Sequence, residues 1–196
     1  MYSIGLSGGL GSGKSLAAKI FFEQGANILN ADDIAKNLIK VKPELIAEIK
    51  EVFGEDCYYK GELQNAILAE RAFKSPESIK KLNAISHPAL KDHLEKYIQA
   101  FKLVSGVLVV EVAILFEAGF QDIFDTTLLV TADDNIRVER AVARGQISEE
   151  SIRERMALQM SEDKKYKLSD YIIENNESEE ELREKCVAFW DKIQLL

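Results

Sequence analysis

The stretch Gly8-Gly9-Leu10-Gly11-Ser12-Gly13-Lys14-Ser15 lies between an apolar run at residues 2–6 and a helical pattern that ends at Gly25. It matches the pattern G-x-x-x-x-G-K-[ST] in its expected place between a strand and a helix. Glycines let backbone N–H groups surround a phosphate, and the N-terminus of the following helix adds positive charge. A chance glycine-rich turn would not bring strand, lysine, hydroxyl and amphipathic helix together in this order. The stretch therefore predicts a binding site for a nucleoside triphosphate.

Within this loop, the lysine and the hydroxyl have separate expected roles. Lys14 should reach the β- and γ-phosphates, and the Ser15 hydroxyl should bind Mg²⁺. The residues expected to contact the nucleotide are Gly11, Ser12, Gly13, Lys14, Ser15 and Leu16.

Length and composition narrow the class of protein. The 196 residues are 46% apolar and 30% charged, which suits one globular domain and is too short for two ordinary ones. The net charge of −8 works against nucleic-acid or anionic-membrane partners.

No apolar run approaches the roughly 20 residues of a membrane span, and no export signal is recognisable, so the expected location is the cytoplasm. Cys57 and Cys186 lack the spacing of a disulfide framework or a metal site, and the oligomeric state is left open.

Short apolar segments recur along the chain and predict the sheet. They lie at residues 26–29, 107–112, 126–130 and 171–173, and helical patterns separate them. With the first strand they predict an α/β fold of the P-loop NTPase type, with a doubly wound, five-stranded parallel sheet.

Two helical segments interrupt this alternation. Between the second and third strands, helical patterns at residues 43–53, 65–73, 76–85 and 87–101 predict an inserted helical lobe, spanning 35–105, that could hold a second substrate. Residues 140–165, broken at Gly145 and resuming as a helix from Ser148, are expected to form a lid. The nucleotide-binding core is then 1–34, 106–139 and 166–196 of a single kinase domain.

Acids at the ends of predicted strands are candidates for chemistry. Phosphoryl transfer needs in-line positioning, charge neutralisation and a base. Asp32 follows the second strand and could accept a hydroxyl proton, although Asn30 or Asp32 could equally cap the next helix. Glu111 ends the third strand, where an acid supports Mg²⁺ and its waters; the alternative is pairing with a basic helix residue.

Arginines supply the positive charge that a triphosphate needs in an acidic chain. Arg140 and Arg144 are four residues apart and share a helix face, where they could contact phosphates. The alternative is a solvated face in which arginines alternate with glutamates. The full basic set is Arg137, Arg140, Arg144, Arg153 and Arg155.

The order of these motifs resembles that of the dephospho-CoA kinase family, over essentially the whole chain. The phosphate loop is similar to the family's Gly-Gly-Ile-Gly-Ser-Gly-Lys-Ser, and Asn30-Ala31-Asp32 to its Asp-Ala-Asp. Further matches are the segment ending in His87-Pro88, the segment Leu115-Phe116-Glu117, the lid residues Arg140, Arg144 and Gln159, and Ile173-Glu174-Asn175.

The resemblance implies transfer of phosphate from ATP, with Mg²⁺, to the ribose 3′-hydroxyl of dephospho-CoA, the final step of coenzyme A biosynthesis. It implies Asp32 as the base, with Lys14 and Arg140 as further catalytic residues, and ATP and dephospho-CoA as the partners. Nucleotide contacts are implied for Arg144 and Asn175, and acceptor contacts for His87, Pro88, Leu115, Phe116 and Glu117.

Two residues depart from the family pattern. Asn30 replaces an acid, which leaves Asp32 as the acid of that motif, with Asp33 as a substitute. Ala113 replaces a proline before Ile114. Neither change removes Lys14, and we expect activity to survive.

Other P-loop proteins are the alternatives. A nucleoside or nucleotide kinase would share the loop, the lid and the insert. A GTP-dependent switch would need Asp-x-x-Gly and Asn-Lys-x-Asp, where this chain has Glu111-Val112-Ala113-Ile114 and Asn175-Asn176-Glu177-Ser178.

Overall fold

Five parallel strands form the sheet that carries the phosphate loop. The computed structural model describes residues 2–103, 106–145 and 148–195, so two residues of the expected insert (104–105) and two of the expected lid (146–147) lie outside it. The strand order is β2-β5-β1-β6-β7, which confirms the predicted sheet. The bounds are β1 Tyr2–Ser7, β2 Asn27–Asn30, β5 Val107–Glu111, β6 Thr126–Thr131 and β7 Tyr171–Glu174.

The central strand β1 is where the chain changes direction across the sheet. It pairs with β5 on one side and β6 on the other, with Leu6 opposite Glu111 and Leu128. Every residue of β5 and β6 is buried, as strands covered on both faces require. Ligands of doubly wound sheets bind at such a switch point, outside the carboxyl ends of the strands. The phosphate loop follows β1 at this point.

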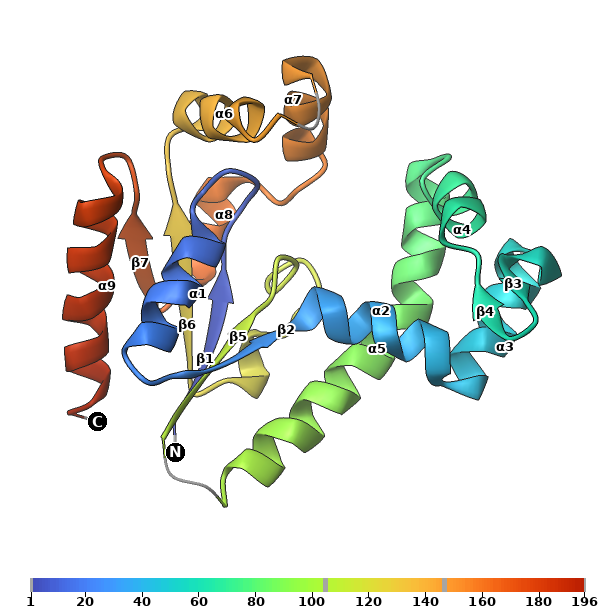
Figure 1. Ribbon diagram of the computed structural model, residues 1–196, viewed down its shortest axis with the longest axis horizontal. Helices are drawn as coiled ribbons and strands as arrows, with labels where there is room; N and C mark the ends of the chain where they lie inside the picture. Colours follow the sequence, from blue (N-terminus) through green and yellow to red (C-terminus); the bar gives the residue numbers. More distant parts are fainter. Residues whose placement is uncertain (1, 104–105, 146–147, 196) are drawn as a thin grey trace. The chain divides into compact units, whose positions relative to one another are not determined.

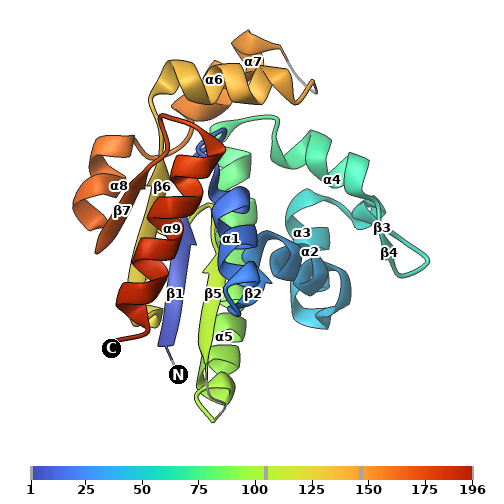
Figure 2. The same ribbon diagram turned by 60° about the vertical axis from the view of Figure 1, so that its left-hand side comes forward.

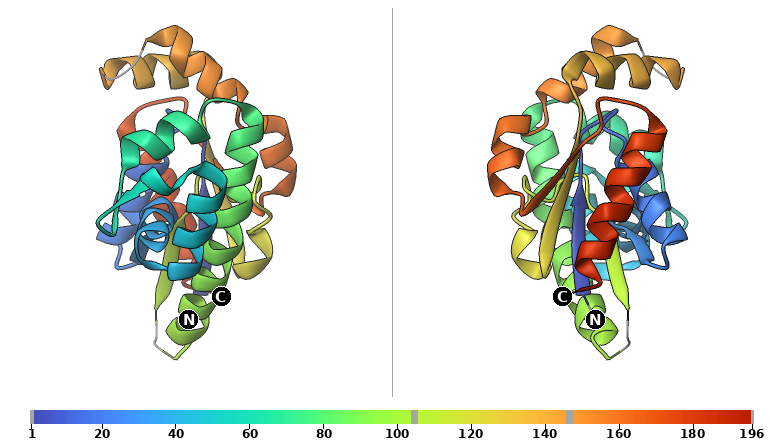
Figure 3. Two further views of the ribbon diagram at one scale, coloured as in Figure 1. Left: turned by 90° about the vertical axis from the view of Figure 1, so that its right-hand side faces the viewer. Right: turned by 90° about the vertical axis from the view of Figure 1, so that its left-hand side faces the viewer.

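Helices cover both faces of this sheet. The helices α1 (Lys14–Glu23) and α9 (Glu179–Ile193) lie side by side on one face, and α8 (Glu162–Leu168) lies on the other (Figures 1 and 3). Phe21 of α1 packs against Phe189 and Trp190 of α9, with ring centroids 5.8 and 6.3 Å apart. Trp190 is thus a core residue.

A pair of helices stands at the carboxyl end of the sheet, beside the phosphate loop (Figure 2). These are α6 (Asp134–Ala143) and α7 (Glu149–Ala157), separated by Gly145, whose φ is +75°. Ser148 caps α7, since its side chain accepts a hydrogen bond from the backbone N–H of Ser151. The break at Gly145 and the helix start at Ser148 are confirmed.

The chain divides into two compact units, one of residues Met1–Asn30 with Ile98–Leu196 and one of Ala31–Tyr97. The second unit contains α2 (Ala31–Val41), α3 (Pro43–Phe53), α4 (Asn65–Ala72) and most of α5 (Pro76–Phe101). The short 3₁₀ turns η1 (Glu55–Cys57) and η2 (Gln121–Ile123) belong to the second and first units respectively.

The structure corrects the helical patterns predicted at residues 76–85 and 87–101. They form one 26-residue helix, α5, with Pro88 inside it. A proline in a helix removes one backbone hydrogen bond and costs about 3 kcal/mol. Leu90, Leu94 and Ile98 recur every four residues and are at most 2% exposed, so burial of this stripe offsets the cost.

The insert also contains a β-hairpin, which the purely helical prediction missed. Strands β3 (Tyr58–Tyr59) and β4 (Glu62–Leu63) are antiparallel. Both turn residues, Lys60 and Gly61, have positive φ, the geometry that matches the twist of a hairpin. None of the helices in the described ranges combines the length and apolar character that a bilayer crossing requires.

Candidate active site

The phosphate loop joins β1 to α1 and leaves the N-terminus of α1 uncapped. The cap residue, Gly13, has φ +96° and offers no side chain to the first backbone N–H groups. Gly11 is also left-handed, with φ +77°, a conformation that glycine adopts without strain. The N-terminus of α1, with its partial positive charge, is thus available to an anion.

A cavity of about 190 Å³ lies at this loop. The loop forms most of its wall, and Ala113, Arg144 and Gln159 complete it. The structure therefore brings Arg144 from the end of α6 to the phosphate loop.

Glu111 connects the lysine and the hydroxyl of the loop. Its Oε2 atom accepts a hydrogen bond from Ser15 Oγ at 3.2 Å and lies 3.6 Å from Lys14 Nζ. Glu111 ends β5 opposite Leu6, so the sheet register itself places the carboxylate beside the start of α1. Glu111 thus pairs with Lys14, a basic residue of α1, and also lies beside Ser15, the residue expected to bind Mg²⁺.

Asn175 binds the phosphate loop at Ser12, and Arg140 binds the backbone of the turn that contains Asn175. Asn175 is buried, and its Nδ2 atom donates to the carbonyl oxygen of Ser12 at 2.9 Å. Arg140 donates to the carbonyl oxygens of Asn175 at 2.7 Å and Glu177 at 2.9 Å. Arg140 thereby ties α6 to the turn between β7 and α9.

Comparison with known proteins identifies the family. A sequence model of the dephospho-CoA kinase family matches residues 2–181. The chain belongs to the dephospho-CoA kinase family. A dephospho-CoA kinase of Corynebacterium diphtheriae is 36% identical over 194 residues, covering 98% of this chain and 97% of the relative. A solved structure from Thermus thermophilus, 32% identical, superposes with a TM-score of 0.79 and covers 97% of both chains.

A second solved structure agrees in fold. The dephospho-CoA kinase of Campylobacter jejuni is 23% identical, with a TM-score of 0.75, and covers 97% of this chain and 96% of its own. As a dephospho-CoA kinase, the protein is a transferase that uses ATP to convert dephospho-CoA into CoA, the final step of coenzyme A biosynthesis.

The expected acceptor residues of this kinase that follow β5 lie in the sheet-containing unit. Leu115 and Phe116 are buried. Glu117 Oε1 accepts a hydrogen bond from the backbone N–H of Met160 at 3.1 Å and lies 3.5 Å from Lys165 Nζ. The segment is thus fastened to α8 and to the chain that precedes it.

The other expected residues of the dephospho-CoA kinase site belong to the second unit. Asp32 is exposed and is the second residue of α2, so it does not cap that helix and the capping alternative for Asp32 is wrong. His87 and Pro88 lie on α5, and burial lowers the pKa of His87 below its usual 6.5.

The sequence motifs of the dephospho-CoA kinase missed the role of Arg137, Glu162 and Lys165. Arg137 is one of the basic set expected to supply positive charge for a triphosphate, yet its side chain is only 3% exposed. Lys165 is fully buried between Glu117 and Glu162, 3.5 Å from each. The available signal was weak, because two of the pairs, Arg137 with Glu162 and Lys165 with Glu117, join residues far apart in sequence.

Proposed function

We propose that the phosphate loop and the side chains around it catalyse transfer of the γ-phosphoryl group from Mg-ATP to the ribose 3′-hydroxyl of dephospho-CoA, with Asp32 as the base. The observation that supports this most is the shared contact of Lys14 and Ser15 with Glu111 at the N-terminus of α1. It joins in one place the cation, the hydroxyl and the carboxylate that phosphoryl transfer by P-loop enzymes uses.

In this proposal, Lys14 and the backbone N–H groups of the loop bind the β- and γ-phosphates. Negative charge is redistributed over these oxygens in the transition state, so fixed positive groups stabilise it without reorganising. Arg144, which already lines the loop cavity, and Arg140 supply further positive charge. Gly11, Ser12, Gly13, Leu16 and Asn175 complete the nucleotide site.

The residues at the loop fit a magnesium ion. Mg²⁺ prefers oxygen ligands and keeps several waters, and Ser15 Oγ and Glu111 Oε2, 3.2 Å apart, are oxygen atoms of the suitable kind. Ser15 would hold the ion directly, and Glu111 would orient its waters. When bound, the ion neutralises phosphate charge.

On the acceptor side, we assign proton removal from the 3′-hydroxyl to Asp32. The carboxylate is exposed in the first turn of α2, and α2 directly follows β2. His87, Pro88, Leu115, Phe116 and Glu117 are proposed to bind dephospho-CoA. The insert at 35–105 would carry the acceptor, 140–165 would act as the lid, and the cytoplasm would be the site of action.

The test is a competition between acceptors. The purified protein is incubated with Mg-ATP and dephospho-CoA, with adenosine and nucleoside monophosphates in parallel reactions, and products are identified by mass spectrometry. We expect CoA alone, and no product when EDTA removes the metal. Phosphorylation of a nucleoside or nucleotide instead would overturn the acceptor, and EDTA-resistant turnover would overturn the metal assignment.

A further inference from the structure

Two side chains of the helical segment beside the loop hold both backbone polar groups of Leu10. Arg137 Nε donates to the carbonyl oxygen of Leu10 at 3.0 Å, and the N–H of Leu10 donates to Gln159 Oε1 at 3.3 Å. Arg137 comes from α6, and Gln159 follows α7. The tip of the phosphate loop is therefore bonded on both sides to residues outside the loop.

Arg137 also meets the two glycines that flank Leu10. A Cβ atom on Gly9 would lie 2.2 Å from Arg137 Nη2, and one on Gly11 would lie 2.2 Å from the carbonyl oxygen of Arg137. Real Cβ atoms do not approach other atoms so closely. Gly11, where the obstructing atom belongs to the backbone, therefore requires glycine, and a side chain at position 9 would displace the end of the Arg137 side chain. Arg137 thus packs against three consecutive residues of the loop.

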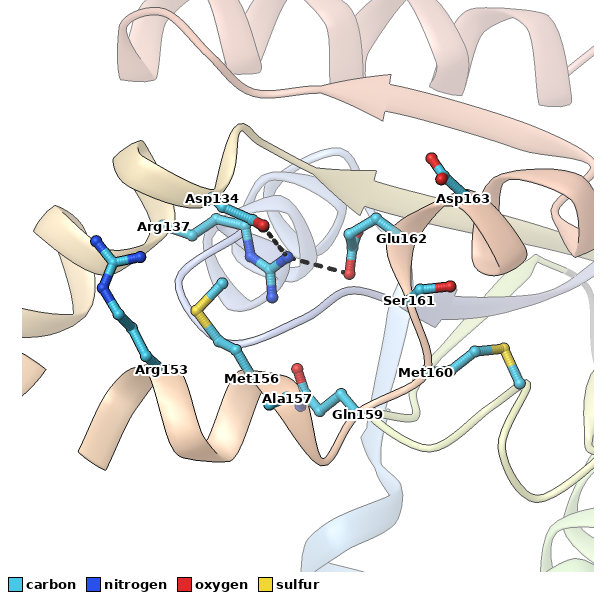
Figure 4. A pocket seen from close by; sticks show the side chains of 10 residues that line it. All are labelled: Asp134, Arg137, Arg153, Met156, Ala157, Gln159, Met160, Ser161, Glu162 and Asp163. Atoms are coloured by element: carbon cyan, nitrogen blue, oxygen red, sulfur yellow. Dashed lines mark hydrogen bonds and ion pairs between the residues drawn. The ribbon is translucent and has the colours of Figure 1, made fainter. Parts of the chain in front are cut away.

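Acidic side chains hold the guanidinium of Arg137 in this position. Its Nη1 atom lies 3.2 Å from a carboxylate oxygen of Asp134 and 3.2 Å from Glu162 Oε1 (Figure 4). The other oxygen of Glu162 accepts a hydrogen bond from Thr131 Oγ1 at 2.6 Å, at the end of β6. Glu162 therefore fixes Arg137 with respect to the sheet.

The burial of Arg137 separates its role from that of a phosphate ligand. The side chain is 3% exposed, and the two carboxylates near Nη1 offset its positive charge. A residue in this state acts on the nucleotide through the backbone that it holds. Apolar packing adds to the hold, since the Leu10 side chain contacts the cluster of Val138, Ala141 and Ile152.

We propose that Arg137, with Gln159, is a positioning residue that sets the phosphate loop of this kinase for ATP at Gly9–Gly11. Loss of the Arg137 contact frees the peptide group that follows Leu10, and loss of the Gln159 contact frees the one that precedes it. In either case the loop's N–H groups no longer converge on the phosphates. The inference rests on the proposed function for its kinetic test and on loop geometry alone for its spectroscopic test.

The kinetic test compares Arg137→Met and Gln159→Met with the unaltered protein. We expect the KM for ATP to rise about tenfold in Arg137→Met and about threefold in Gln159→Met, because small misplacements of a binding loop are costly. The KM for dephospho-CoA should stay within about twofold. Arg183→Met is the matched control, since it removes an arginine whose partner is Glu23, 2.6 Å away at the C-terminal end of α1 rather than in the phosphate loop; its KM for ATP should not change.

The second readout does not use turnover. Amide hydrogen exchange at Leu10, measured by NMR in the protein without nucleotide, should become faster by about tenfold or more in Gln159→Met, which removes the acceptor of that N–H. A merely structural role for these residues would lower the melting temperature and the active fraction, and would leave the KM for ATP and the relative exchange at Leu10 unaltered.

The outcomes are separable. Folded variants with an unchanged KM for ATP, or unchanged exchange at Leu10, would overturn the positioning role. If Arg137→Met does not fold, the less buried Gln159→Met decides the matter with both readouts. If the unaltered protein makes no CoA, the proposed function fails, and the exchange measurement still tests the hold on Leu10.

Discussion

The side-chain amide of Asn175 donates a hydrogen bond to the carbonyl oxygen of Ser12 at 2.9 Å, and both residues are buried. A Cβ atom on Gly13 would lie only 2.2 Å from Nδ2 of Asn175, so the amide packs directly against this glycine. The C-terminal end of β7 thus holds the second half of the phosphate loop, as Arg137 and Gln159 hold the first half. The loop's conformation depends on residues more than 100 positions further along the chain.

Replacement of Asn175 by leucine tests this relationship. Asn175→Leu leaves the buried carbonyl of Ser12 without its donor, which should lower the free energy of unfolding by about 1–3 kcal/mol and raise the KM for ATP. Urea unfolding and steady-state kinetics measure the two effects. Asn176→Leu is the matched control, because Asn176 bonds to Asp133 rather than to the loop. Equal changes in KM in the two variants would contradict the role of the Asn175 amide.

Lys14→Ala should abolish most turnover while the fold is retained. The ammonium group lies at the loop, 3.6 Å from Glu111, and its loss removes the fixed charge that we propose acts on the transferred phosphoryl group. We expect kcat to fall by about 10²–10³-fold, measured as CoA formed per second. Lys19→Ala is the control, since Lys19 is an exposed lysine of the same helix. Activity close to that of the unaltered enzyme would refute the role given to Lys14.

The sequence could predict the sheet and the loop because their signals are local. Strand β5 is a continuous apolar run, and the phosphate loop is one uninterrupted motif. The cap of α9 is also local, because Ser178 accepts a hydrogen bond from the backbone N–H of Glu181, three residues further along the chain.

The elements that were missed depend on packing or on weak turn signals. Residues 76–85 and 87–101 were predicted as separate helical patterns, yet the buried stripe of α5 keeps one helix continuous through Pro88. The hairpin β3–β4 is only two residues long on each side, and its one available signal was Lys60-Gly61, a pair with positive φ. Periodicity is not measurable over two residues.

The contacts around Leu10 could not be predicted for a different reason. Arg137 and Gln159 are separated from Leu10 by more than 120 residues, and ion pairs such as Arg137 with Glu162 leave no periodic pattern. In sequence, an arginine among glutamates indicates a solvent-exposed helix face, whereas the fold buries the side chain of Arg137. The sequence shows that Arg137 is charged, and the tertiary structure shows that this charged side chain binds the backbone of Leu10.

Lys165 gives a prediction about stability. Its side chain is fully buried and lies 3.5 Å from both Glu117 and Glu162. Lys165→Met leaves the Glu117 carboxylate without its cation and leaves Glu162 with Arg137 alone. Because both carboxylates are partly exposed, we expect the free energy of unfolding to fall by about 2 kcal/mol. Lys164→Met, at an exposed neighbour, should change the free energy of unfolding by less than about 0.5 kcal/mol. Urea denaturation at neutral pH compares them, and equal stabilities would show that the buried lysine is replaceable.

Asp32→Asn tests the assigned base. An amide cannot accept the hydroxyl proton, so kcat should fall by about 10²-fold or more while the KM for dephospho-CoA changes far less. Asp33→Asn is the informative companion, since Asp33 is the neighbouring acid in the same helical turn and pairs with Lys36. A larger fall in kcat in Asp33→Asn than in Asp32→Asn would assign the role of the base to Asp33. An effect of Asp32→Asn on thermal stability alone would remove the catalytic role.

His87 predicts how stability depends on pH. Burial lowers the pKa of His87 in the folded protein below 6.5, so the unfolded chain binds the proton more tightly than the folded one. The stabilisation from its neutral form is therefore complete above pH 6.5 and is lost as the pH falls through 6.5 towards the lower pKa of the folded state.

His87→Gln removes this titration. We expect the free energy of unfolding of the unaltered protein to decrease more steeply between about pH 7 and pH 5 than that of His87→Gln, measured by urea unfolding at half-unit steps of pH. His93→Gln, on the same helix α5, serves as the matched histidine variant and should retain the steep slope. Parallel slopes for His87→Gln and the unaltered protein would mean that the ring takes up its proton in the folded state as readily as in the unfolded chain, contrary to its burial in α5.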